Sequence, residues 1–150
     1  MNKLDKYTRI KNQLIKLFKA TSHPQARMAT VAALLFHKID YFYWTGFYEL
    51  IDEELTVSAY QGTLACLVLK KDFGVCWEAV HTEEPVLVAD VSKFPSHIAC
   101  DSKTKSEVVI PVFKDNKIVA VLDIDSVELN SFDLDDIIGL MKIVELIYKP

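Results

Sequence analysis

Apolar residues recur at helical spacing near both ends of this chain and at strand spacing between them. An amphipathic helix is expected over about the first twenty residues, and a nearly all-apolar helix from Pro24 to about His37. Pro24 follows three polar residues, which is typical of a helix start because proline fits the first helical turn. A third helical pattern covers residues 133–148. In sequence order, helices therefore precede and follow the central strands.

Five strand patterns and a short helix are expected in the middle of the chain. The strands are predicted at residues 43–51, 55–60, 85–88, 107–113 and 117–124. Residues 64–69 form either a short strand or an ordered loop, and residues 75–81 predict the helix. Residues 89–105 predict a long functional loop. The expected fold class is α+β, as one domain over residues 1–150, with an antiparallel sheet and helices packed on one face.

Composition and charge argue against two classes of function. The formal net charge is −4 and no face is obviously rich in Lys and Arg, which argues against nucleic acid as a partner. The apolar run at residues 28–36 is well short of the roughly 20 residues that a membrane span needs. Three cysteines without a secretion signal do not indicate a disulfide framework, so a reducing cytoplasm is the expected compartment.

Cys100 is the first candidate for chemistry, because it lies in the long polar loop. Three basic residues close in sequence, His97, Lys103 and Lys105, could lower the pKa of its thiol. The simpler interpretation is that Cys100 is a small apolar residue packed beneath the loop. A sulfenic acid on Cys100 could condense with a nearby thiol. For Cys66, the local sequence favours a buried core position over a role as that partner thiol. Cys76 lies near the start of a predicted helix, which favours a thiolate, but core packing explains it equally well.

A zinc site is a further alternative for the same residues. It would be built from Cys66, Cys76, His97 and Cys100. The closely spaced cysteine pairs of structural zinc sites are missing here, so the sequence disfavours it.

Three acidic residues are predicted to meet at one end of the sheet. Asp123 and Asp125 are two positions apart in a strand, so both side chains face the same way, and Glu107 opens the partner strand. Neighbouring carboxylates repel unless a cation such as a ligand ammonium lies between them. A solvated strand end is the equal alternative. Trp44 and Tyr48 also share one face of a strand, where core packing is more common than a role in a pocket.

Taken together, these segments resemble the free methionine-R-sulfoxide reductases, which are built on a GAF domain. The matching segments follow the family's order and lie at residues 44–48, 61–66, 74–76, 90, 94–101, 106–111 and 121–126. The segment 97–101 (His-Ile-Ala-Cys-Asp) and the positions of the three cysteines are specific to this family. The resemblance implies a GAF fold and reduction of free L-methionine-R-sulfoxide to L-methionine.

The resemblance also implies roles for the cysteines. Cys100 would be the thiolate that attacks the sulfoxide sulfur and is left as a sulfenic acid. Cys66 would be the main resolving thiol, and Cys76 a secondary partner. The family usually has glycine directly after the equivalent of Cys76, whereas this chain has Trp77, which weakens the role of Cys76.

The remaining site residues follow from the same resemblance. Glu107, Asp123 and Asp125 would hold the substrate ammonium, and one of these acids would help to protonate the departing oxygen. Trp44 and Tyr48 would wall the pocket for the S-methyl group. Main-chain N–H groups before Cys100 would bind the carboxylate. The resemblance implies no metal and no organic cofactor, thioredoxin as the dithiol donor, and a homodimer as an option through the terminal helices.

Two other functions remain open at this point. A GAF sensor would bind a small molecule without turning it over, although binding alone does not explain a cysteine loop beside an acidic cluster. A redox switch would use a Cys66–Cys100 disulfide to change an interaction with a partner, and peroxide would oxidise it as readily as a sulfoxide.

Overall fold

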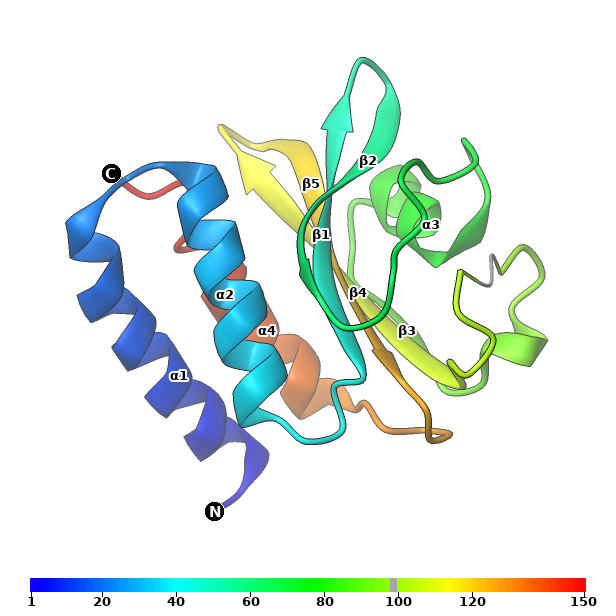
Figure 1. The fold of residues 1–150 in the computed structure, drawn as a ribbon, viewed down its shortest axis with the longest axis horizontal. Coiled ribbons are helices and arrows are strands. Elements are labelled where there is room, and N and C mark those ends of the chain that lie inside the picture. The colour runs from blue at the N-terminus through cyan, green and yellow to red at the C-terminus, as the bar shows by residue number, and fades with distance from the viewer. Residues whose placement is uncertain (98–99) are drawn as a thin grey trace.

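A five-stranded antiparallel sheet forms the centre of the molecule in the computed structural model, which describes residues 1–97 and 100–150 (Figure 1). The strand order is β2-β1-β5-β4-β3. The strands are β1 (Trp44–Ile51), β2 (Glu54–Gln61), β3 (Val86–Val88), β4 (Ser106–Lys114) and β5 (Lys117–Ser126). All five predicted strands are therefore present.

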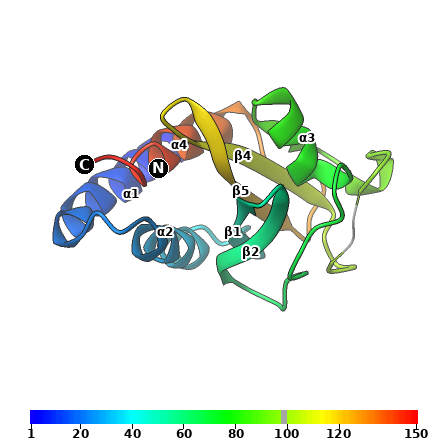
Figure 2. The ribbon, with the colours of Figure 1, turned by 90° about the horizontal axis from the view of Figure 1, so that it is seen from above.

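Helices cover both faces of this sheet. On one face lie α1 (Lys3–Leu17), α2 (Pro24–Lys38) and α4 (Leu134–Val144), with α2 and α4 against the strands and α1 mainly against α4 (Figure 2). This confirms the expected α+β arrangement with the N- and C-terminal helices on one face. The short helix α3 (Gly74–Thr82) packs on the opposite face against β4 and β5, a second layer that the expected arrangement did not include.

Side chains alternate between the two faces of the sheet, and each face carries its own apolar core. Beneath the large helices, Phe47, Ile110 and Leu122 pack with apolar residues of α1, α2 and α4. On the other face, Val109 and Val121 pack with residues of α3. The second core is smaller, and it leaves room at its edge for a pocket.

A buried arginine ties the helical layer together. The Arg27 guanidinium, on α2, donates to the carbonyl oxygens of Thr21 (2.8 Å), Phe18 (3.1 Å) and Leu146 (3.0 Å). These carbonyls lie at the end of the first helical segment and just beyond α4, where helix ends leave acceptors unpaired. The predicted helices are a few residues too long at both places, because α1 gives way to a 3-10 helix (Phe18–Ala20) and α4 ends at Val144.

The ambiguous segment 64–69 is partly strand-like. Val57 N–H donates to the Leu67 carbonyl (2.8 Å), and Leu69 N–H donates to the Leu55 carbonyl (3.0 Å). An isolated bridge joins Thr56 to Val68. The segment is thus held along the free edge of β2. Within the described part of the chain, no helix has the length and apolar character to cross a membrane.

Candidate active site

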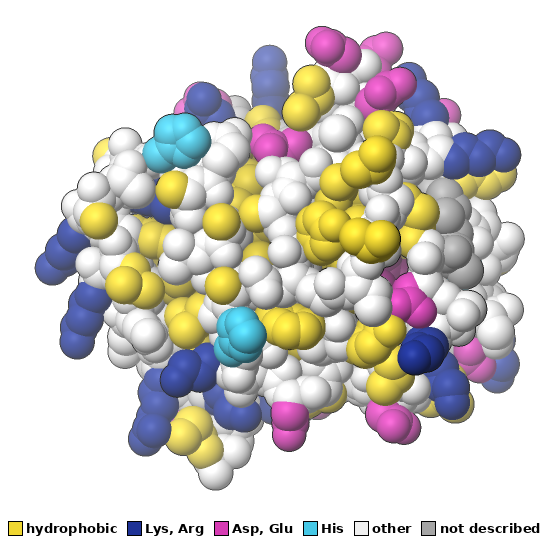
Figure 3. All heavy atoms as spheres, viewed as in Figure 1, with side chains coloured by type: hydrophobic (Ala, Val, Ile, Leu, Met, Phe, Trp, Pro, Cys, Tyr) yellow, Lys and Arg dark blue, Asp and Glu magenta, His cyan; other side chains and the backbone are white. Residues whose placement is uncertain are grey.

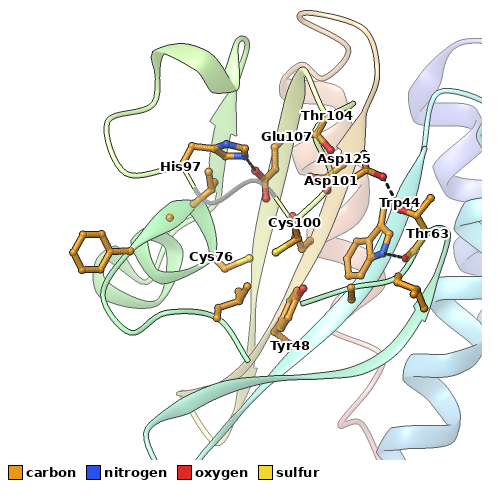
Figure 4. Close-up of a pocket in the computed structure, with 17 residues that line it drawn as sticks. Trp44, Tyr48, Thr63, Cys76, His97, Cys100, Asp101, Thr104, Glu107 and Asp125 are labelled. Carbon is orange, nitrogen blue, oxygen red and sulfur yellow. Dashed lines mark hydrogen bonds and ion pairs between the residues drawn. The ribbon is translucent and has the colours of Figure 1, made fainter. Parts of the chain in front are cut away.

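A pocket opens on the α3 face, at the end of the sheet where β1, β4 and β5 carry their polar residues. Segments 63–65 and 73–76 form one side of it, and the end of the long loop forms another. Its walls include seven of the eight residues singled out from the sequence: Trp44, Tyr48, Cys76, Cys100, Glu107, Asp123 and Asp125. Figure 4 shows the labelled members of this set pointing into the same space. The eighth, Cys66, is bonded to Cys100.

The Cys66–Cys100 disulfide joins the 62–69 segment to the long loop. The two Cα atoms are 5.6 Å apart, although the residues are separated by 34 positions in the sequence. The disulfide implied by the family resemblance is therefore present. It also occupies two of the four donors of the zinc set considered from the sequence. Cys76 is the free cysteine, and it is buried.

The three carboxyl groups meet as the strand pattern predicts. Glu107 lies directly opposite Asp125 across β4 and β5, and Asp123 lies two residues further along on the same face. Glu107 and Asp123 are buried within the pocket wall, and Asp125 is half-buried there. Burial first, and then the repulsion from Asp125, raises the pKa of Glu107 to about 8. Burial and neighbouring carboxylates likewise raise the pKa values of Asp123 and Asp125 well above their ordinary range. The alternative of a solvated strand end is thus wrong.

Two of these acids carry an oxygen with no partner. Among the described residues, the buried side-chain oxygens without a hydrogen bond include Asp123 Oδ1, Asp125 Oδ1 and Thr104 Oγ1. Buried polar atoms are almost always paired in native proteins. All three residues line the pocket, so their oxygens suit a ligand that brings several N–H donors, such as an ammonium group.

Cys76 lies in the first turn of α3, as predicted, but its thiol does not have the expected tendency to ionise. Burial, followed by the negative charges of Asp123 and Glu107, raises the pKa of Cys76 well above its ordinary value. The prediction that the helix N-terminus would favour a thiolate is therefore wrong, because these effects outweigh the helix dipole. Trp77, the departure from the family pattern, is buried in the second core behind this thiol.

Trp44 and Tyr48 form the aromatic wall of the pocket. The Trp44 ring stacks on the ring of Tyr48, with centroids 5.9 Å apart, and on Tyr60, at 5.4 Å. A Cβ at Gly46 would lie only 2.5 Å from the Trp44 ring, so glycine lets the indole lie along the strand. Trp44 Nε1 also donates to the Thr63 carbonyl (2.9 Å), which fixes the ring over the pocket.

His97 and Asp101 also line the pocket, although sequence reasoning considered His97 only as a neighbour of the Cys100 thiol or a zinc ligand and gave Asp101 no role. His97 Nε2 lies 3.4 Å from Glu107 Oε1, and burial lowers the pKa of this histidine. Asp101 Oδ2 accepts hydrogen bonds from Tyr43 (2.8 Å) and from Thr63 (2.7 Å). Both residues belong to the segment 97–101, which carries the family resemblance, and that was the available signal. The main-chain N–H groups expected to bind a carboxylate include residues 98 and 99, which lie outside the described residues.

Comparison with known proteins shows which family this chain belongs to. A family model described as GAF domain matches residues 25–147, so the chain belongs to the GAF domain family. Within it, the chain belongs to the free methionine-R-sulfoxide reductases. The free methionine-R-sulfoxide reductase of Escherichia coli (strain K12) is 35% identical over 149 residues, covering 99% of this chain and 90% of the relative.

Solved structures agree with this assignment. The free methionine-R-sulfoxide reductase from Neisseria meningitidis, in complex with its substrate, has a TM-score of 0.94 at 33% identity and covers 99% of this chain and 89% of its own. The reduced form of the fRMsr of Staphylococcus aureus has a TM-score of 0.90 at 42% identity, and the match covers 95% of this chain and 92% of the S. aureus chain. The predicted family and GAF fold are therefore confirmed.

Proposed function

We propose that this protein reduces free L-methionine-R-sulfoxide to L-methionine, with Cys100 as the nucleophile. The observation that carries the proposal is the Cys66–Cys100 disulfide at the wall of a pocket whose buried acids leave Asp123 and Asp125 oxygens unpaired. A redox-active thiol and a receptor for a cationic group thus share one small cavity. Family membership supports the same reaction.

The acidic cluster would serve both binding and proton transfer. With its pKa raised to about 8, Glu107 holds a proton in the empty cluster at neutral pH, and burial shifts the pKa values of Asp123 and Asp125 in the same direction. A substrate ammonium can replace a proton of the cluster and donate to the unpaired oxygens. An acid that keeps its proton can then donate it to the sulfoxide oxygen, which makes the sulfur a better electrophile.

Three redox steps complete one catalytic cycle. The Cys100 thiolate attacks the sulfoxide sulfur, the oxygen passes to Cys100 with one proton, and methionine leaves with Cys100 as a sulfenic acid. The Cys66 thiol then attacks the Cys100 sulfur, which forms the disulfide and releases water. A dithiol such as thioredoxin, which we propose as the cytoplasmic electron donor, reduces the disulfide to two thiols and is itself oxidised.

Selectivity for the free amino acid follows from the charged groups of the pocket. A methionine sulfoxide within a peptide has no α-ammonium, so the buried acids would remain unpaired when it bound. A site built for polar contacts discriminates strongly against a ligand that lacks them. Trp44 and Tyr48 would hold the S-methyl end of the substrate against their apolar faces.

A dithiothreitol-driven assay tests the proposal. The substrates are free L-methionine-R-sulfoxide, the S epimer and a peptide-bound methionine-R-sulfoxide, with methionine release measured by chromatography. We expect turnover of the free R epimer alone. No turnover with any of the three, in folded protein with titratable thiols, would overturn the proposal and favour a ligand-binding sensor.

A further inference from the structure

Four of the large apolar side chains exposed to solvent lie within one short segment around Cys66. They are Leu64 (86% exposed), Leu67 (74%), Val68 (47%) and Phe73 (44%), and we call them the Cys66 patch. The space-filling view shows hydrophobic side chains gathered on the face that this segment crosses (Figure 3). Contiguous exposed apolar surface of this kind commonly marks a binding site.

The Cys66 patch is held in place by main-chain bonds. Leu67 and Leu69 exchange hydrogen bonds with Val57 and Leu55 of β2, and the side chain of Leu69 is buried as an anchor. The outward direction of Leu67 and Val68 is thus fixed by strand pairing. A rigid apolar surface loses little conformational entropy when a partner covers it.

The two sulfur atoms of the disulfide have different surroundings. Cys100 is exposed and belongs to the wall of the substrate pocket, whereas Cys66 is absent from that wall and is half-buried against the second core. In the sequence Cys66 lies between Leu64 and Leu67, and Leu64 and Phe73 connect the patch to the rim of the pocket. A thiolate attacks a disulfide sulfur in line with the bond that breaks. An approach to Cys66 therefore comes from the side away from Cys100.

We propose that the Cys66 patch is the docking surface for a protein dithiol reductant, whose thiolate attacks Cys66 Sγ. The inference rests on the proposed function, since the disulfide has to be reduced in every cycle. Attack forms a mixed disulfide between the reductant and Cys66, and Cys100 leaves as a thiolate. The second thiol of the reductant then attacks its own bonded sulfur, releases Cys66 as a thiol, and leaves the reductant oxidised by two electrons.

The chemistry of the patch fits a protein with apolar surface around its reactive thiol. None of its four side chains is charged or polar, so it offers burial of apolar area and no ionic selection. A small dithiol reaches the sulfur without covering these residues. Dependence on the patch thus distinguishes a docking protein from a small reductant.

The first test compares two reductants on the same variant. Leu67→Glu introduces a charge into the patch at a residue outside the pocket wall, and Leu17→Glu is the matched control at an exposed leucine of α1. Turnover of L-methionine-R-sulfoxide is driven either by thioredoxin with its reductase and NADPH, or by dithiothreitol. For Leu67→Glu we expect kcat/KM for thioredoxin to fall about tenfold, as for an interface residue worth ~1.4 kcal/mol.

The outcomes separate this inference from the proposed function. We expect dithiothreitol-driven turnover of Leu67→Glu, and both activities of Leu17→Glu, to stay within about twofold of wild type. An unchanged kcat/KM for thioredoxin in Leu67→Glu would overturn the docking surface alone. Wild-type protein inactive with both reductants would overturn the proposed function, and this inference with it.

A trapping experiment identifies the sulfur that is attacked. Oxidised wild-type protein is mixed with a thioredoxin variant whose second active-site cysteine is serine, so that the mixed disulfide persists. Peptide mass spectrometry is expected to find the adduct on Cys66, and Leu67→Glu should form it about tenfold more slowly. An adduct on Cys100 would overturn the assignment of Cys66 as the attacked residue.

Discussion

Glu107 and Asp125 face each other as direct partners across β4 and β5, so a buried and a half-buried carboxyl group share one cross-strand position. Like charges placed opposite each other in a sheet are destabilising. The strand pair tolerates them in one of two ways: by keeping protons on the acids, or by admitting a cation between them. The same pair therefore links the stability of the empty protein to pH and to ligand binding.

The first prediction concerns pH and the free energy of unfolding. The pKa of Glu107 is about 8 in the folded protein and near 4.5 in the unfolded chain, so the folded state binds more protons between these values. Stability thus falls as pH rises through this window, by up to about 1.4 kcal/mol per pH unit for one group. Urea unfolding of the reduced, ligand-free protein at pH 5, 6, 7 and 8 measures the slope.

Glu107→Gln is the control for that slope, because it keeps the side-chain shape and removes the titrating proton. We expect the variant to lose less stability than wild type between pH 5 and pH 8. Equal slopes for the two proteins would show that Glu107 does not titrate in this window.

The second prediction concerns substrate affinity. Asp125→Asn and Asp123→Asn each remove an acid that can ionise when the substrate ammonium binds, and in the empty pocket each of these acids has an unpaired oxygen. Loss of a hydrogen bond to a charged group costs about 1.5–3 kcal/mol, so KM for L-methionine-R-sulfoxide should rise at least about tenfold and kcat should fall. Asp115→Asn, in the exposed β4–β5 turn, is the matched control. Unchanged kinetics in both pocket variants would remove these acids from the substrate site.

Strand periodicity was sufficient to predict the acidic cluster. Asp123 and Asp125 are two apart, and Glu107 opens the neighbouring strand, so alternation and hairpin pairing alone bring them together. The pairing of Cys66 with Cys100 was different. Nothing in local sequence brings residues 34 positions apart into contact, and it was the family resemblance that implied the disulfide.

Burial and side-chain networks were harder to anticipate. The helix N-terminus at Cys76 is evident in the sequence, but the carboxylates that raise its pKa come from β4 and β5, which are distant in sequence and pack against α3 only in the folded protein. The bonds of Asp101 to Tyr43 and Thr63 likewise depend on which loops meet at the pocket. Such electrostatic effects arise from tertiary contacts, which local patterns do not encode.

The third prediction separates the roles of the two bonded cysteines. Cys100→Ser should abolish reduction of the sulfoxide, because no thiolate remains to attack the sulfur. Cys66→Ser should still release about one methionine per protein molecule, then stall with a sulfenic acid on Cys100 when thioredoxin is the reductant. Quenched-flow release of methionine, together with dimedone labelling, measures both. Sustained turnover by Cys66→Ser with thioredoxin would refute its role as the resolving thiol.

The last prediction concerns stability at a distance from the pocket. Asp136, in the first turn of α4, is fully buried and accepts hydrogen bonds from Tyr7 (2.7 Å), Tyr41 (2.6 Å) and the Lys3 ammonium (2.7 Å). Asp136→Ala would leave the Tyr7 and Tyr41 hydroxyls without this acceptor at the junction of α1 and α4, while Lys3 keeps its bonds to Asp133 and to the Ser131 carbonyl. Breaking a buried charged network of this kind costs about 3–5 kcal/mol.

The melting temperature of Asp136→Ala should therefore fall by roughly 10 °C, as measured by calorimetry. Asp135→Ala, one residue away on the same helix, should change stability by less than about 1 kcal/mol, the size of a helix-dipole contribution. Because α4 lies on the face opposite the pocket, dithiothreitol-driven turnover of folded Asp136→Ala at low temperature should match wild type. A melting temperature equal to that of wild type would show that the Asp136 network contributes no net stability.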